Sequence, residues 1–114
     1  MLTRRGVTGL LAGSALLSSA SARAQGSGFP DRPVRMLIGF PPGGTVDTIG
    51  RLISPPIAAR LGQPVVIENR GGAAGVLAVE QVARGRPDGY TIILASAGAL
   101  VVIPHMNSSM PYDP

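Results

Sequence analysis

The sequence predicts an α/β fold in which helices flank a parallel β-sheet. Three short apolar runs, at residues 34–40, 64–67 and 90–95, contain β-branched residues and are bounded by Gly, Pro or Asp, a pattern typical of buried strands. Their centres are about 27 residues apart, the spacing of strand–helix–strand units. The segments between the runs are therefore expected to be helices.

The first connecting segment is expected to form a helix with one apolar face. Apolar residues recur there at helical spacing, at Ile49, Leu52, Ile53, Ile57 and Leu61. Asp47 or Thr48 is expected to cap the start of this helix, and Gly62 to end it. Because proline removes a backbone hydrogen bond and clashes with the preceding turn, Pro55 and Pro56 predict a kink or two short helices.

The second connecting segment, from about Ala74 to Arg84, is also expected to be helical. The residues expected to face inward are Val76, Val79, Val82 and Ala83. Pro87-Asp88-Gly89 then predicts a tight turn into the third strand.

Composition and charge exclude several classes of site. The 114 residues contain no cysteine and one histidine, so a disulfide framework, a thiol nucleophile and a Cys-ligated metal are excluded, and no metal or other cofactor is expected. The basic excess comes mainly from residues 1–24, which hold three arginines and no acid. Residues 25–114 carry seven arginines against six acidic residues. This near-neutral part does not predict a nucleic-acid partner.

The first 24 residues have the composition of a cleavable export signal. Arg4 and Arg5 precede an apolar stretch at residues 6–17, and an Ala-Arg-Ala sequence ends at Ala24. Cleavage is expected between Ala24 and Gln25, which would leave no stable membrane anchor. An uncleaved anchor is the alternative, and both the twin-arginine and the general secretory routes remain open.

Residues 40–47, Phe-Pro-Pro-Gly-Gly-Thr-Val-Asp, carry the clearest signal of a binding site. They join the carboxyl end of a buried strand to a helix start, where glycines let backbone N–H groups converge and the helix end favours an anion. A plain strand-to-helix turn has the same residues, and Asp47 can be simply its cap. No Gly-Lys-Ser/Thr follows, which excludes a Walker loop.

Two more loops are expected at the same edge of the sheet. Residues 71–75 are glycine-rich but lack the spacing of a dinucleotide fingerprint, and residues 68–70 before them can pair with each other or with the first loop. Ser96 follows the third strand. A nucleophile elbow would need glycine where Leu94 stands, so Ser96 is expected to bind a ligand oxygen or cap a turn. Ligands of open α/β sheets bind outside the carboxyl ends of the strands, which favours binding over catalysis.

Six short motifs also suggest a family. They are Arg32-Pro33-Val34-Arg35, Phe40-Pro41-Pro42-Gly43-Gly44 with Asp47, Arg60-Leu61-Gly62-Gln63-Pro64-Val65-Val66, Glu68-Asn69-Arg70, Pro87-Asp88-Gly89-Tyr90-Thr91 and Pro111-Tyr112-Asp113-Pro114. In this order they resemble the amino-terminal portion of the Bug family, the TctC-like extracytoplasmic receptors of tripartite tricarboxylate transporters. The resemblance covers about residues 29–114.

The resemblance implies a type II-like periplasmic binding protein whose two α/β lobes close on a small carboxylate, without a metal, and deliver it to a membrane permease. Residues 25–114 would then be an incomplete first lobe, following a signal peptide at 1–24. The ligand-binding positions that it implies are Phe40, Pro42, Gly43, Gly44, Thr45, Asp47, Ser96, Ala97 and Gly98.

The chain departs from the family pattern in places. Thr45 stands where a third glycine is common, and Ala97 replaces a residue that is often polar. The chain is also much shorter than family receptors, which suggests a truncated reading frame or gene fragment. The alternatives are an exported hydrolase that uses Ser96 and a secreted interaction module that uses the sheet edge or the apolar stretch 99–103.

Overall fold

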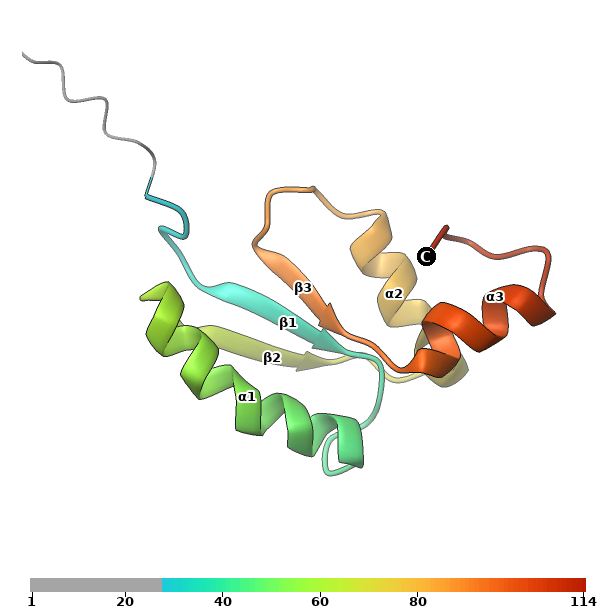
Figure 1. Cartoon of the computed structure of the whole chain (residues 1–114), viewed down its shortest axis with the longest axis horizontal. Coiled ribbons are helices and arrows are strands. Elements are labelled where there is room, and N and C mark those ends of the chain that lie inside the picture. Colours follow the sequence, from blue (N-terminus) through green and yellow to red (C-terminus); the bar gives the residue numbers. More distant parts are fainter. Residues whose placement is uncertain (1–27) are drawn as a thin grey trace, which may run out of the picture.

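A computed structural model describes residues 28–114 of the chain (Figure 1). The predicted signal peptide and its cleavage point between Ala24 and Gln25 lie outside this part. The elements in chain order are β1 (Val34–Ile38), α1 (Thr45–Leu61), β2 (Val65–Asn69), η1 (Ala73–Gly75), α2 (Val76–Ala83), β3 (Thr91–Leu94), η2 (Gly98–Val102) and α3 (Ile103–Met106).

The three strands form a parallel sheet in the order β2-β1-β3. The predicted α/β class is therefore confirmed, and each strand lies within one or two residues of its expected bounds. β1 is central because it is the most apolar strand, and four of its five residues are buried. Both crossovers contain a helix, as parallel pairing requires.

The two longer helices cover opposite faces of the sheet (Figure 1). Successive residues of a strand point to opposite faces. Ile38 faces α1, where its Cδ1 lies against Gly50, whereas the next residue, Gly39, lies against Gly75 at the start of α2. α1 packs mainly on β2, and α2 packs mainly on β3. The result is a three-layer arrangement with β1 in the core.

The first helix is one helix of 17 residues, so the expectation of two short helices is wrong. Pro55 and Pro56 lie on its exposed side. There the carbonyl groups that lose their N–H partners are open to water, and the Ser54 hydroxyl donates a long 3.5 Å hydrogen bond to the Arg51 carbonyl. Solvation of these carbonyls on the outer face lets the helix continue through both prolines.

The ends and face of α1 also differ in part from expectation. Gly62 ends the helix in the left-handed conformation (φ 70°), as predicted, but Gly44 occupies the N-cap position in place of Asp47 or Thr48. Ile49 and Leu52 were expected to face inward and are 45% and 70% exposed. The helix approaches the sheet at a glycine instead, so its inward face is rotated toward Val46, Gly50, Ile53 and Ile57.

The second helix begins later than expected, at Val76 rather than about Ala74. Ala74 has a positive φ of 54°, which belongs to a left-handed turn and not to an α-helix. Val79 is buried as predicted, but Ala83 is exposed and Ala78 takes its place on the inward face. Positions 75, 78, 79 and 82 make a regular helical stripe, which explains the replacement.

The carboxyl-terminal segment folds back onto the core through Tyr112. η2 is a π-helical turn in which the Ile103 N–H bonds to the Gly98 carbonyl. The corresponding partner of the next carbonyl, that of Ala99, would be Pro104, which has no N–H. The buried Tyr112 hydroxyl donates to the Ala99 carbonyl instead, at 2.6 Å. This bond satisfies a buried acceptor that the proline would leave unpaired.

Candidate functional site

The loops that follow the three strands meet at one edge of the sheet. In the parallel register Ile38 lies opposite both Asn69 and Leu94, so residues 40–47 and 95–98 leave the sheet at the same end (Figure 1). The first and second loops touch: a Cβ at Gly71 would lie 3.5 Å from the Pro41 ring. We call these three loops the carboxyl rim, comprising residues 39–44, 70–75 and 95–98.

Asp47 holds the first loop of the rim in place. This side chain is only 2% exposed, although it lies in the first turn of α1. Its Oδ2 accepts hydrogen bonds from Arg51 Nε at 2.9 Å and from the Gly43 N–H at 3.0 Å. Its Oδ1 accepts from Asn69 Nδ2 at 2.9 Å. The carboxylate therefore links the loop, the helix and the end of β2.

These donors favour the ionised form of Asp47. The hydrogen bond from Arg51, followed by those from Gly43 and Asn69, lowers the pKa of this carboxyl from 3.8 to about 2. A carboxylate with three donors has little capacity left for a ligand, and it would repel an anion. In this geometry Asp47 shapes the loop rather than presenting a charge at the surface.

We expect acid to destabilise the chain through Asp47. Because its folded pKa of about 2 lies below its ordinary 3.8, its stabilisation is complete above pH 3.8 and is lost as the pH falls toward 2. Glu68, whose pKa is lowered chiefly by a hydrogen bond from Arg35, acts in the same direction. Melting temperatures measured by circular dichroism across this interval should depend less on pH in Asp47→Asn.

Thr48→Ala provides the control for this measurement. It removes an exposed hydrogen bond to the Gly44 carbonyl from the same helical turn, but no titrating group. It should keep the acid dependence of the unmodified chain. An Asp47→Asn variant with an unchanged slope would contradict the role of this carboxylate.

Asn69, the last residue of β2, supports this site from outside the rim, and the sequence did not single it out. Pairing of residues 68–70 with the first loop was one of the open possibilities, and the structure realises it for Asn69. Its Nδ2 donates to the Phe40 carbonyl at 3.0 Å as well as to Asp47. Both partners are acceptors, so only the NH₂ end of the side chain can face them. Glu68 pairs instead with Arg35 of β1, through two hydrogen bonds of 2.7 and 2.8 Å.

The amino end of α1 presents unpaired donors beside this loop. Within residues 28–114, no group accepts a hydrogen bond from the backbone N–H of Thr45, Val46 or Asp47. Gly44 provides no side-chain cap. The partial positive charge of a 17-residue helix is added at the same point. This arrangement can bind an anion without any lysine or arginine.

The third loop contributes a hydroxyl that also caps a turn. Ser96 Oγ accepts a hydrogen bond from the Ala99 N–H at 3.3 Å, and the Ser96 carbonyl accepts from Ala99 and Leu100. The hydroxyl proton is left to donate to another acceptor. His105, the one histidine of the chain, lies in α3, and its Nδ1 is 2.7 Å from the Val101 carbonyl.

The predicted site residues differ in their exposure. Pro42, Gly43, Gly44, Thr45 and Ala97 are exposed, Phe40, Ser96 and Gly98 are half-buried, and Asp47 is buried. Between residues 28 and 114, no three His, Asp or Glu side chains lie close enough together to hold a metal ion. Over the same residues, no helix combines the length and the apolar character needed to cross a membrane.

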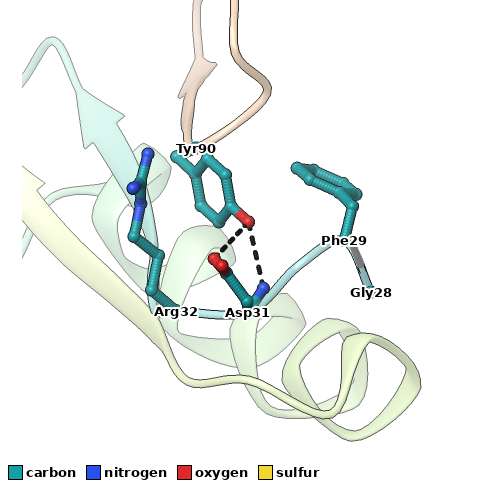
Figure 2. Close-up of a pocket in the computed structure, with 5 residues that line it drawn as sticks. All are labelled: Gly28, Phe29, Asp31, Arg32 and Tyr90. Carbon is teal, nitrogen blue, oxygen red and sulfur yellow. Dashed lines mark hydrogen bonds between the residues drawn. The ribbon is translucent and has the colours of Figure 1, made fainter. Parts of the chain in front are cut away.

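A pocket of about 250 Å³ lies at the opposite edge of the sheet, beside Tyr90 (Figure 2). The Tyr90 hydroxyl donates to Asp31 Oδ1 at 2.7 Å and accepts from the Asp31 N–H at 3.0 Å. Arg32 lies 4.0 Å over the same ring, and Phe29 packs edge-on against it. Since Tyr90 and Asp31 form hydrogen bonds with each other, the cluster connects the segment before β1 to the start of β3.

Comparison with known proteins gives consistent matches. The model of the tripartite tricarboxylate transporter family receptor matches residues 49–114. A UPF0065 protein of Bordetella pertussis is 45% identical over 98 residues, which are 86% of this chain and 30% of that relative. The chain therefore spans about a third of the length of this relative.

Two solved structures resemble the described fold. One is the structure of a periplasmic transporter, with a TM-score of 0.72 and 40% identity over 75% of this chain and 29% of the other. The other is MatC from Rhodopseudomonas palustris with bound malate, with a TM-score of 0.71 and 41% identity over 75% of this chain and 29% of the other.

Proposed function

The chain belongs to the tripartite tricarboxylate transporter receptor family, and from this premise we propose that it contributes one wall of a receptor site for a small carboxylate. The proposed site is the carboxyl rim together with the first three residues of α1, Thr45, Val46 and Asp47. Capture there would precede delivery to a membrane permease. Residues 1–24 would act as the export signal and residues 25–114 as part of the first lobe, in the periplasm.

The observation that carries this proposal is the set of three unpaired N–H groups at the start of α1. Thr45, Val46 and Asp47 lie in the first turn of a long helix, beside a loop that Asp47 itself holds rigid. A carboxylate placed there would receive several hydrogen bonds and the favourable field of the helix end. A loop that is already ordered would add little entropy cost on binding.

The remaining positions would complete the wall around this point. Phe40, Pro42, Gly43 and Gly44 would form its near side, and Ser96, Ala97 and Gly98 its far side, where the Ser96 proton is available for a ligand oxygen. The similarity to MatC with bound malate supports a dicarboxylate as the class of ligand. Because this wall is open to water, binding by the chain alone is expected to be weak.

An amide-resolved NMR titration of the chain with malate tests the proposal. We expect chemical-shift changes at residues 43–47 and 96–98, and none at the Tyr90 cluster. Uncharged malamide serves as the control ligand, since it keeps the shape of malate without its charges. Shifts confined to the Tyr90 cluster, equal shifts with malamide, or no shifts at millimolar malate would contradict the proposal.

Thr45→Pro makes the test specific to one donor. Thr45 is the first helical residue, where proline is well tolerated, and the preceding Gly44 has the extended conformation (φ −79°, ψ 175°) that a residue before proline requires. The substitution therefore removes one N–H and leaves the helix in place. We expect malate to bind about tenfold more weakly. Thr45→Ala keeps the N–H and should change the affinity by less than about twofold.

A further inference from the structure

We infer that Asn69 is a positioning residue of the carboxyl rim, which sets the shape of the first loop without touching the ligand. The inference rests on the proposed carboxylate site and extends it to a residue outside that site. One amide group of Asn69 donates to two acceptors on either side of the loop. These are the Phe40 carbonyl at the beginning of the loop and Asp47 Oδ1 just after its end.

The backbone of Asn69 gives these two bonds a fixed reference. Asn69 is the last residue of β2 and pairs in register with Ile38, the last residue of β1. The next residue, Arg70, donates its N–H to the Ile38 carbonyl at 2.8 Å. The backbone that bears the Asn69 side chain is therefore paired with β1 at Asn69 itself and at the next residue. Since Ile38 is fully buried, this reference lies in the core.

The chain of contacts leads from Asn69 to the loop amides through Asp47. Asn69 holds Oδ1, which orients Oδ2 toward the Gly43 N–H and the Arg51 side chain. Gly43 has a positive φ of 89°, and its N–H bond to Asp47 fixes the turn that brings the chain into α1. Without the Asn69 amide, the loop would lose its side-chain bond at the Phe40 carbonyl, and the Asp47 carboxylate would be held through Oδ2 alone.

The chemistry of this position is specific to asparagine. Aspartate has the same shape, but it would place a second carboxylate against Asp47 and an acceptor against the Phe40 carbonyl. Alanine would remove both donors and leave their acceptors unpaired. Glutamine would carry the amide one methylene group too far from a strand that cannot shift. The nearby Glu68 is a suitable control position, because its side chain bonds to Arg35 and not to the loop.

The first measurement is made without ligand, on Asn69→Ala, Asn69→Asp and the control Glu68→Gln in the full chain. Amide hydrogen exchange at Gly43 is expected to speed up about tenfold in both Asn69 variants. In Asn69→Ala the NMR-measured pKa of Asp47 should rise from about 2 toward 3.8. Glu68→Gln should leave both quantities unchanged. If Asn69→Asp does not fold, Asn69→Ala carries the comparison, because it adds no charge.

The second measurement is the malate titration of the same variants. We expect the Asn69 variants to bind about tenfold more weakly and Glu68→Gln to bind within about twofold of the unmodified chain. Variants of Asn69 that lower the melting temperature but leave Gly43 exchange and the Asp47 pKa unchanged would overturn the inference. If the unmodified chain does not bind malate, the proposed function fails, and Gly43 exchange still decides the role of Asn69.

Discussion

Replacing Gly39 with alanine is expected to lower the free energy of unfolding by about 1–3 kcal/mol and to disorder the second loop of the rim. A Cβ at Gly39 would lie 2.7 Å from the Gly75 Cα and 3.2 Å from the Gly75 carbonyl oxygen. These are backbone atoms, which cannot move aside by changing a rotamer. Gly75 would have to shift away from β1, and it precedes α2 directly.

Chemical denaturation followed by circular dichroism measures this effect, with Gly28→Ala as the matched control. Gly28 has open space around its Cβ position and is expected to change stability by less than about 0.5 kcal/mol. Amide hydrogen exchange should show that the loss of protection in Gly39→Ala begins at residues 71–76. A Gly39→Ala variant as stable as Gly28→Ala would mean that the first and second loops do not meet as described.

The sheet and the meeting of its loops were predictable because they depend on local patterns and topology. Short apolar runs bounded by Gly, Pro and Asp are typical of strands, and their spacing requires crossover helices. Once the strands are parallel, their carboxyl ends must share an edge. No knowledge of side-chain contacts was therefore needed to predict that the first and third loops lie at the same end of the sheet.

The face of α1 was not predictable from hydrophobic periodicity. Ile49 and Leu52 fit an apolar stripe, yet they are exposed because the closest approach of α1 to the sheet is at Gly50, against Ile38. A glycine carries no hydrophobic signal, although it permits the tightest packing. The left-handed turn at Ala73 and Ala74 was hidden for a similar reason, since alanine usually favours a helix.

The role of Asp47 was also beyond local reasoning. The expectation that Asp47 is the N-cap is wrong, because Gly44 takes that position. Asp47 is the third helical residue, and its carboxylate reaches back to the Gly43 N–H, much as the acidic member of a capping box does. Its position in a ligand site stays a prediction. The contribution of Asn69 depends on the register of β2 with β1, which becomes known only when the sheet is assembled.

Leu37→Ala is expected to have the largest effect of all, a loss of about 2–5 kcal/mol in the free energy of unfolding. Leu37 is completely buried on the central strand. It lies on the same face of the sheet as Gly39, so its truncation leaves a cavity on the α2 side of β1. The core that would have to absorb this cavity is small, because several large apolar side chains, including Leu52 and Met106, remain exposed. A domain of this size is stabilised by only about 4–13 kcal/mol.

Urea denaturation of Leu37→Ala, with Val66→Ala as the control, tests whether β1 is the centre of this core. Val66 lies on the neighbouring strand β2 but is 46% exposed, so its truncation should cost less than about 1 kcal/mol. Since Val66 pairs in register with Arg35, it lies on the same face of the sheet as Leu37. Equal losses in the two variants would therefore mean that the core of this face is not centred on β1. The three loops would then lack a rigid base, and the helix amides could not be held in place for an anion.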